Sequence, residues 1–280
     1  MTYPLPQRGA LVEATAPAAT FITAPIADVS VVAVRPESGL LFWWDSLRVP
    51  LMVFVFAAAV LATTNVDIDL ARWAFYDSVA HHWRGAGNWW VNEFVHIGGR
   101  WLVRVLVLAA VLIWASAFAN RRRLRWCRPA AYFAISVILT VGIVGLLKSV
   151  TNVHCAWDLA PFGGRFPYVH LFARRPEYLA PGQCFPAAHA SSGYALMALY
   201  FVFRERNRRW ALAGLACGIF VGLVFGLAQQ SRGAHLLSHD VWSAMLAWLI
   251  PLSVYTFAFK RRLWRRDAVA TSAVAHDAVI

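Results

Sequence analysis

The chain has 280 residues, of which 60% are hydrophobic and only 14% are charged, and its net charge is +12. An ordinary soluble domain has about 45–50% apolar and about 25% charged residues, so a soluble globule of this size could not bury such an excess of apolar surface. Composition therefore excludes a soluble enzyme, a coiled coil and a disordered chain. It predicts an all-α polytopic membrane protein whose basic residues lie in cytoplasmic loops rather than on nucleic acid.

The two ends of the chain are expected to be tails. Residues 1–39 are rich in Ala, Pro, Thr and Val and lack the charged region, apolar core and cleavage site of a signal peptide. We expect a flexible cytoplasmic tail there, a membrane domain over 40–262, and a second cytoplasmic tail over 263–280. The aromatic run 41–44 is expected to anchor the first span at the membrane interface.

Six apolar stretches are interpreted as membrane spans, and five of them have the length that a bilayer core requires, about 17–21 residues. They lie at 48–64, 101–118, 130–147, 190–203, 211–230 and 241–259. The fourth is short, so we expect its helix to begin inside the polar segment that precedes it. The sequence thus predicts six transmembrane helices.

Three basic clusters alternate with these stretches in a regular way. They occupy the loops after the second and fourth stretches and the segment after the sixth: Arg121, Arg122, Arg123, Arg125 and Arg128; Arg204, Arg206, Arg208 and Arg209; Lys260, Arg261, Arg262, Arg265 and Arg266. Six alternating helices bring all three to one side. By the positive-inside rule, that side and both termini are cytoplasmic.

The opposite side carries two long segments. Residues 65–100 are rich in Trp and Gly and are expected to form one or two amphipathic helices at the interface. The tryptophans at 83–90 are assigned to an interface belt, and no role beyond the interface is expected for His81, His82 and His96. Residues 148–189 are expected to form a polar loop.

Three polar clusters lie at the outer ends of the third to sixth predicted spans. They cover 148–158, 184–193 and 231–240, and together they bring cations and histidines to one membrane face without a run of carboxylates. Lys148 supplies a point charge and Arg232 a planar fork suited to phosphate oxygens. The sequence therefore predicts an anion site for phosphate at the membrane surface.

The histidines of these clusters suggest a division of labour. His189 stands at the expected N-terminus of a helix, where free N–H groups favour an anion. One histidine can attack phosphorus while another protonates the leaving oxygen. His235 and His239 are four residues apart and share a helix face, so His239 or Asp240 can hold the ring of His235 in one tautomer.

The three clusters resemble the three signature motifs of the type 2 phosphatidic acid phosphatase (PAP2) family, over roughly residues 100–258. The family pattern is a lysine followed by Arg-Pro, then Pro-Ser-Gly-His, then Ser-Arg with a downstream His and Asp. The resemblance implies six helices and an active site at the outer face. It also implies a metal-independent reaction in which the third-motif histidine forms a phosphohistidine and the second-motif histidine protonates the leaving group.

Carried over by position, Lys148 matches the first-motif lysine and His189 the general acid. The run Gly233-Ala234-His235-Leu236-Leu237-Ser238 matches the third motif and makes His235 the nucleophile, with His239 in the Asp slot and Gln229 in the Arg slot. In a rival register, Ser231-Arg232 stays aligned, His239 is the nucleophile and Ser243 takes the Asp slot. We favour His235.

Several positions depart from the family pattern. The Arg-Pro of the first motif is Cys155-Ala156 here, so one phosphate cation is missing, and Arg165, Arg174 or Arg175 is expected to replace it. The Ser and Gly of the second motif are both alanine, and Ala188 is carried over as a phosphate contact. Cys155 and Cys184 flank the site and can form a disulfide in an oxidising compartment, whereas Cys127 and Cys217 are expected to be free thiols.

These features predict a lipid phosphatase of the bacterial inner membrane that acts at the periplasmic face. Expected substrates are an isoprenyl diphosphate, phosphatidylglycerol phosphate, phosphatidic acid or the phosphates of lipid A, and no cofactor, metal or nucleic acid is expected. The alternatives are a phosphotransferase that uses the same phosphohistidine, and a non-catalytic lipid-binding protein or transporter.

Overall fold

The fold was obtained as a computed structural model that describes residues 39–119 and 124–259. The expected tails at 1–39 and 263–280 lie outside the described residues, apart from Gly39. So do Arg121–Arg123 and the basic cluster that begins at Lys260. The described part of the chain is mostly helical and has almost no strand, as the composition predicts.

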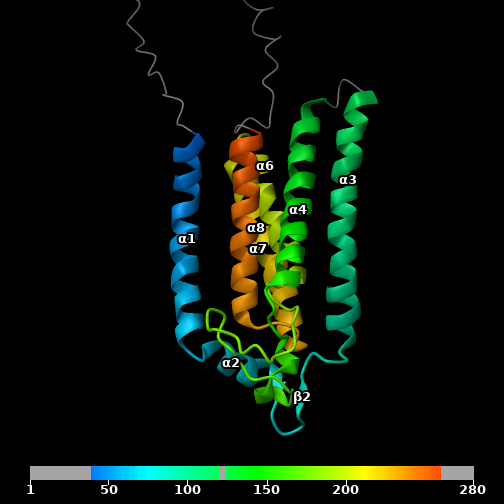
Figure 1. Cartoon of the computed structure of the whole chain (residues 1–280). Coiled ribbons are helices and arrows are strands. Elements are labelled where there is room, and N and C mark those ends of the chain that lie inside the picture. The colour runs from blue at the N-terminus through cyan, green and yellow to red at the C-terminus, as the bar shows by residue number, and fades with distance from the viewer. Residues whose placement is uncertain (1–38, 120–123, 260–280) are drawn as a thin grey trace, which may run out of the picture. The chain divides into compact units, whose positions relative to one another are not determined.

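Long helices lie side by side and make up most of the described chain (Figure 1). Their bounds are Gly39–Thr63 (α1), Gly99–Ala119 (α3), Leu124–Val150 (α4), Arg208–Ser231 (α7) and Leu237–Ser253 (α8). Trp90–Gly98 is a π-helical extension that leads directly into α3, and Val254–Ala258 extends α8 in the same way. Five of these continuous helices are long and apolar enough to cross a membrane.

The fourth predicted span is a shorter, composite helix. It consists of α5 (Ala188–Tyr194), a single 3₁₀ turn at Ala195–Met197, and α6 (Ala198–Arg204). As predicted, it begins within the polar segment that precedes the apolar stretch. All six predicted stretches coincide with helices to within one residue, although the fourth is not among the five that meet the length of a membrane span.

Glycines bring α7 against the composite helix. Gly214, Gly218, Gly222 and Gly226 recur every four residues and therefore share one face of α7. A Cβ atom at Gly218 would lie 2.3 Å from the Met197 nitrogen, and one at Gly193 of α5 would lie 2.8 Å from the Gly222 Cα. This close approach of two backbones sets the distance between the segment that carries His189 and the segment that carries His235.

The hydrophobic core lies where α4, α6 and α8 meet. Tyr132, Phe201 and Leu252 are fully buried, and the Tyr132 hydroxyl donates a hydrogen bond to the Pro251 carbonyl (3.0 Å). By contrast, α1 and α3 leave most of their apolar side chains exposed. Such faces are suited to contact with lipid rather than with water.

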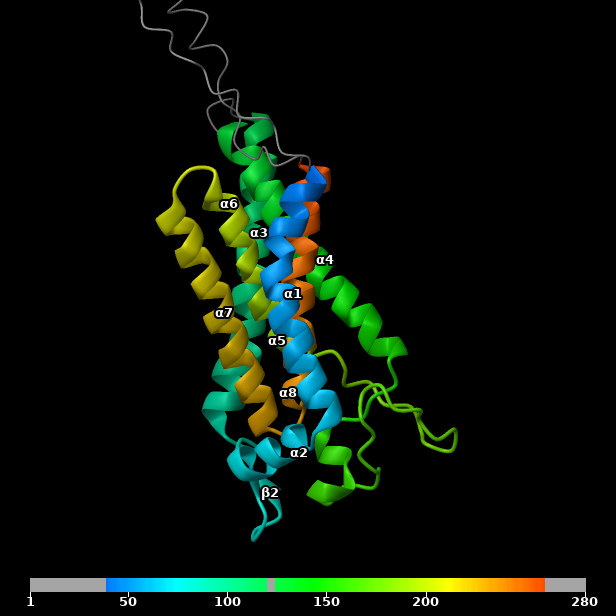
Figure 2. The same ribbon diagram turned by 90° about the vertical axis from the view of Figure 1, so that its left-hand side faces the viewer.

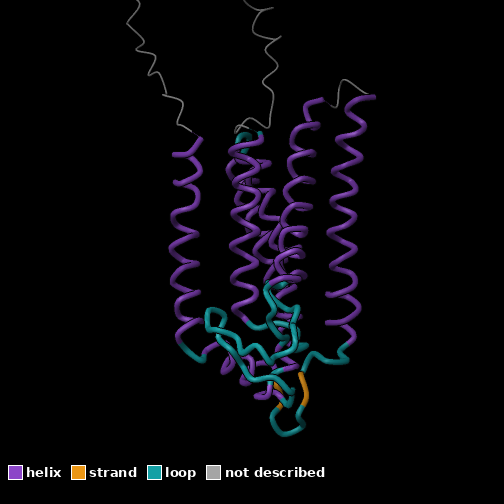
Figure 3. The backbone as a smooth tube through the Cα atoms, viewed as in Figure 1, coloured by secondary structure: helices purple, strands orange, loops and turns teal. Residues whose placement is uncertain are grey.

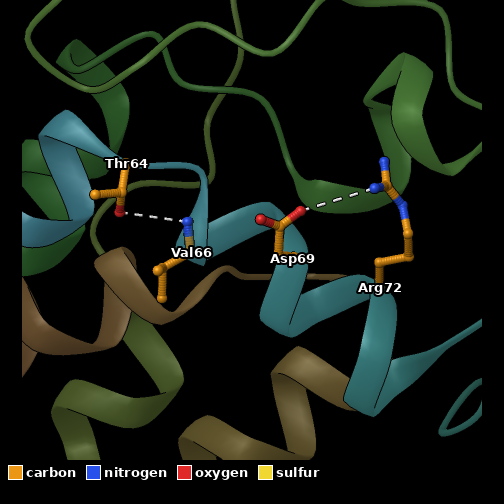
Figure 4. Close-up of polar contacts among 4 residues, drawn as sticks. All are labelled: Thr64, Val66, Asp69 and Arg72. Carbon is orange, nitrogen blue, oxygen red and sulfur yellow. Dashed lines mark hydrogen bonds and ion pairs between the residues drawn. The ribbon is translucent and has the colours of Figure 1, made fainter.

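The long loops gather at one end of the helices, which we call the loop end (Figures 2 and 3). There, α1, α3, α4, α5, α7 and α8 each begin or end, and α2 (Val66–Leu70) follows α1 after a tight turn. Figure 4 shows this turn, in which the Val66 N–H donates to the Thr64 hydroxyl, and the exposed ion pair between Asp69 and Arg72 (3.8 Å) that follows it. The loop end is the membrane face on which the sequence places the polar clusters.

The segment between α1 and α3 differs from the amphipathic helices expected for 65–100. After α2 and a π-helical turn, strands β1 (Tyr76–Asp77) and β2 (His82–Trp83) pair as an antiparallel hairpin. In the turn of this hairpin, the Asp77 side chain accepts hydrogen bonds from the backbone N–H groups of Val79 and Ala80 (both 2.9 Å). Trp83 is also buried, against Tyr76 and Phe162, so its assignment to an interface belt was wrong.

The described arginines of the basic clusters lie at the opposite end. Arg125 and Arg128 are in the first turns of α4, and Arg204, Arg206, Arg208 and Arg209 surround the turn between α6 and α7. The Arg204 guanidinium stacks over the Phe42 ring, with 4.4 Å between the Cζ atom and the ring centroid. The described arginines of the basic clusters and the three polar clusters therefore lie at opposite ends of the helices.

Candidate active site

A cross-linked loop forms one wall of the candidate site. Cys155 and Cys184 form a disulfide with a Cα–Cα distance of 5.0 Å. Beside it, the Cys184 N–H donates to the Val153 carbonyl (2.8 Å) and the Gly182 N–H donates to the Asn152 side chain (2.7 Å). These contacts hold the segment after α4 against the segment before α5. Among the described residues, Cys127 and Cys217 are free thiols.

A cavity of about 580 Å³ opens at the loop end and brings the three polar clusters together. Lys148 enters from the end of α4, His189 from the first turn of α5, and Arg232 and His235 from the connection between α7 and α8. Ala188 and both disulfide cysteines also line it. In the described part of the chain, no carboxylate lines this cavity, which is the electrostatic character of an anion site.

His235 and His239 are in direct contact. Their Nδ1 atoms are 3.3 Å apart, and both rings are buried. The backbone of Cys184 is hydrogen-bonded to both imidazoles. The contact between His235 and His239 that the sequence predicts is therefore present, although His235 lies in the turn before α8 and only His239 lies in the helix.

His189 lies against α3 and α7 from its place on α5. Its ring stacks on Phe225 (4.5 Å between centroids), and it is hydrogen-bonded to the Val95 backbone. The Nε2 atom is buried and has no hydrogen-bond partner among the described residues. A buried nitrogen without a partner is costly, so a bound ligand or water is needed to satisfy it.

Gln229 links two residues of the cavity wall. Its Oε1 atom accepts a hydrogen bond from Arg232 Nη1 (3.2 Å), and its Nε2 atom pairs with His96 Nδ1. His96 in turn lies next to His189, with 4.7 Å between the ring centroids. The residue in the family's Arg slot therefore holds Arg232 at the cavity, and His96, which was expected to be only an interface residue, lines the site.

Asp240 does not take part in this arrangement. Its Oδ2 atom accepts a hydrogen bond from Gln230, and its side chain lines an apolar groove beside α1 rather than the cavity. The expectation that Asp240 orients His235 was therefore wrong, because the side chains of His239 and Asp240, consecutive residues of α8, point in different directions and only His239 contacts His235.

A different carboxylate supports the start of α8. Asp67 of α2 is buried and accepts hydrogen bonds from both the backbone N–H (3.0 Å) and the hydroxyl of Ser238. Burial raises the pKa of Asp67, and the hydrogen bonds from Ser238 oppose that shift. Asp67 thus acts as a capping residue from a distant segment and fixes the turn that presents His235 and His239.

None of the three arginines expected to replace the first-motif arginine lines the cavity. Arg165 and Arg174 are exposed, and Arg174 pairs with Glu177 (3.8 Å). Arg175 faces His239 from a separate small cavity, so none of the three candidates lines the site. Instead, Arg100 and Arg104 of α3 line it. The sequence contained a sign of these residues: two arginines four positions apart stand at the start of an apolar span, where the free-energy cost of placing a charge in the membrane is high.

The electrostatics of the site suit a neutral nucleophile. Burial, His239 and Lys148 together lower the pKa of His235 well below its usual value of 6.5. The imidazole therefore stays uncharged at neutral pH and keeps a lone pair for attack.

Among the described residues there is no group of three or more His, Cys, Asp or Glu side chains that could hold a metal ion.

Comparison with known proteins identifies the region that contains these motifs. The family model described as PAP2 superfamily matches residues 129–263, which include Lys148, His189, His235 and their helices. No curated protein and no solved structure matches the chain.

Proposed function

Because residues 129–263 place the chain in the PAP2 superfamily, we propose that it is an integral-membrane lipid phosphatase that works through a phosphohistidine. Membership supports phosphatase-type activity on phosphoric esters, and the membrane-crossing helices support a substrate held in a bilayer. The observation that carries the finer proposal is the cavity in which Lys148, His189, Arg232 and His235 meet without a carboxylate.

In the first step, Nε2 of His235 attacks phosphorus and the bond from phosphorus to the lipid oxygen breaks. His189 gives a proton to the departing oxygen, which leaves as the lipid alcohol or, from a diphosphate, as the lipid monophosphate. Lys148 and Arg232 hold the non-bridging oxygens and offset the negative charge that develops on them. Both roles fit the positions of these side chains on the cavity wall.

In the second step, water replaces the lipid. His189, now neutral, takes a proton from the water as the water attacks the phosphohistidine, and inorganic phosphate leaves while His235 regains its lone pair. If a lipid hydroxyl replaced water, the same intermediate would give a phosphotransferase. The chemistry needs no change in the protein between the two steps other than the proton on His189.

His239 determines which tautomer of His235 is present. With 3.3 Å between the two Nδ1 atoms, one nitrogen must donate and the other accept. When the Nδ1–H of His235 donates to His239, the lone pair of His235 lies on Nε2, the atom proposed to attack phosphorus. The family's aspartate in this slot always accepts, whereas His239 accepts only in its neutral form with the proton on Nε2.

The membrane orientation is part of the proposal. The described arginines at the end opposite the cavity support a cytoplasmic location for that end, and hence a periplasmic cavity in a bacterial inner membrane. A cysteine introduced at exposed Tyr178 is expected to react with a membrane-impermeant maleimide in intact spheroplasts, and one at Arg208 is not. The reverse pattern would contradict this orientation.

The test of the activity is phosphate release by the full chain in detergent, with EDTA present, from phosphatidic acid, phosphatidylglycerol phosphate, an isoprenyl diphosphate and lipid A. We expect release from at least one of them, and its loss in His189→Ala and His235→Ala. His82→Ala is the matched control, because His82 is exposed at the loop end and does not line the cavity. No release from any lipid by folded protein would contradict a phosphatase.

A further inference from the structure

Two arginines of α3 bring more positive charge to the cavity than one phosphate requires. Arg100 and Arg104 are four residues apart and share a helix face, and both line the cavity with Lys148 and Arg232. The Trp101 ring lies 5.1 Å from the Arg104 Cζ atom and supports that side chain. Four cations thus surround a single space.

These cations have no anionic partner in the described part of the chain. No carboxylate lines the cavity, and none pairs with Arg100, Arg104 or Arg232. The two α3 arginines also fall within a candidate membrane span, Trp90–Ala119. Unpaired charge is expensive at this depth, so ionisable residues in such a position indicate a functional site.

The α3 arginines are close to the groups proposed for catalysis. Burial and the charge of Arg100 both lower the pKa of Arg232, so the two guanidinium groups lie within electrostatic reach of each other. Arg232 is tied through Gln229 to His96, which contacts His189. A ligand that spans from His235 to Arg100 would therefore remain within one continuous wall of the cavity.

The cavity is also larger than a single phosphate needs. Its volume of about 580 Å³ is in the range that holds a whole small-molecule ligand. A phosphate monoester carries a charge of about −2 at most, which four cations exceed. A head group with a second phosphate matches both the charge and the space.

We infer that Arg100 and Arg104, together with Arg232, form a second anion subsite that binds a non-reacting phosphate of the lipid head group. This inference rests on the proposed function, because the other phosphate is the one that His235 attacks. It narrows the substrate class to lipids with two phosphates in one head group. It also assigns this selectivity to α3, which lies outside the part of the chain matched by the family.

The experiment compares substrates that differ by one phosphate. Hydrolysis of farnesyl diphosphate and farnesyl phosphate, and of phosphatidylglycerol phosphate and phosphatidic acid, is measured for the wild type and for Arg100→Gln/Arg104→Gln. We expect kcat/KM of the double variant to fall about tenfold or more for the preferred two-phosphate lipid and less than about threefold for its one-phosphate counterpart. Arg72→Gln removes an exposed cation at the loop end that does not line the cavity, and it is expected to change neither (Figure 4).

The two pairs of lipids separate the two possible sources of the second phosphate. A loss confined to farnesyl diphosphate assigns the subsite to a directly bonded phosphate, and a loss confined to phosphatidylglycerol phosphate assigns it to one that is separated by glycerol. Equal losses on the one-phosphate and two-phosphate lipids would overturn the inference, because the arginines would then serve only the reacting phosphate.

A binding measurement separates failure of the subsite from failure of the proposed function. Calorimetric titration of inorganic pyrophosphate and phosphate into the His235→Ala protein needs no turnover. We expect pyrophosphate to bind about tenfold or more tightly than phosphate, and this preference to disappear when Arg100 and Arg104 are also replaced by Gln. If pyrophosphate does not bind more tightly than phosphate, the subsite inference is wrong even if the protein hydrolyses lipids. If it does bind more tightly, and the preference depends on the two arginines, the subsite inference stands even if no lipid is hydrolysed.

Discussion

The two halves of the described chain contribute to the cavity in different ways. The half from α4 to α8 is the more deeply buried, and it supplies Lys148, His189, Arg232 and His235. The half from α1 to α3 is largely exposed, and it supplies His96, Arg100 and Arg104. The groups proposed to react therefore lie in the well-packed half, where their positions are fixed, and the groups proposed to select a head group lie on a peripheral helix.

The largest expected effect is in the buried half. His235→Ala is expected to lower kcat by several orders of magnitude on every substrate, because no other group can form the covalent intermediate. His239→Ala should cost less, and His239→Asn should retain much of the activity, because Asn Oδ1 takes the place of Nδ1 as acceptor. Phosphate release measures both. If His239→Asn and His239→Ala were inactive while His235→Ala kept its activity, the rival register would be correct.

The second largest expected effect is that of His189→Ala, and it shows whether His189 acts as a general acid or only binds phosphate. His189→Ala is expected to lower kcat by about 10²–10⁴-fold on lipid phosphates, whose alkoxide leaving group must be protonated. With 4-nitrophenyl phosphate the loss should be far smaller, since nitrophenolate leaves without a proton. The comparison of the two substrates is the measurement. Equal losses on both would mean that His189 binds phosphate and is not the acid.

The third effect is on pH dependence. The lowered pKa of His235 means that the nucleophile stays neutral and active as the pH falls below 6.5, and activity is lost only when the pH falls through the lowered pKa. Lys148→Met removes one of the charges that lower this pKa, so the acid limb of kcat/KM should move to higher pH as the activity falls. An acid limb that stays in place in Lys148→Met would contradict electrostatic coupling between the two residues.

The smallest expected effect is on the stability of the fold, and it tests how the α1–α3 half supports the α4–α8 half. Asp67→Ala is expected to lower the stability of the fold by about 1–2 kcal/mol, because the N–H and hydroxyl of Ser238 lose their acceptor. Asp69→Ala is the matched control, since Asp69 is exposed and its pair with Arg72 contributes little (Figure 4). Thermal unfolding in detergent compares them, and equal shifts would show that Asp67 has no special role.

Much of the fold could be predicted because the bilayer imposes it. Apolar stretches long enough to span must be helices, so all six were located in the sequence. The hairpin at 76–83 could not be predicted, because it depends on packing of Tyr76 and Trp83 against Phe162, far along the chain. Local sequence alone gives no sign of that partner.

The residues of the candidate site also fall into two groups, those that local sequence predicts and those that depend on packing. Lys148, His189 and His235 could be predicted from local motifs. The contact between His235 and His239 was also predicted, although the turn before α8, not a shared helix face, brings the two rings together. Arg100 and Arg104 could not, because which face of α3 meets the cavity depends on how α3 packs beside α4. The absence of Asp240 from the cavity follows from the direction of one side chain, which a motif does not specify.

In the proposed mechanism, His235 carries the phosphate between the two steps. The most direct measurement is to mix the protein with a lipid substrate, quench it within one turnover, and locate the phosphorylated residue by mass spectrometry under conditions that preserve phosphohistidine. We expect phosphate on His235, with more of it in His189→Ala when the substrate has a good leaving group. Turnover with phosphate on His239, or with no phosphorylated residue, would contradict it.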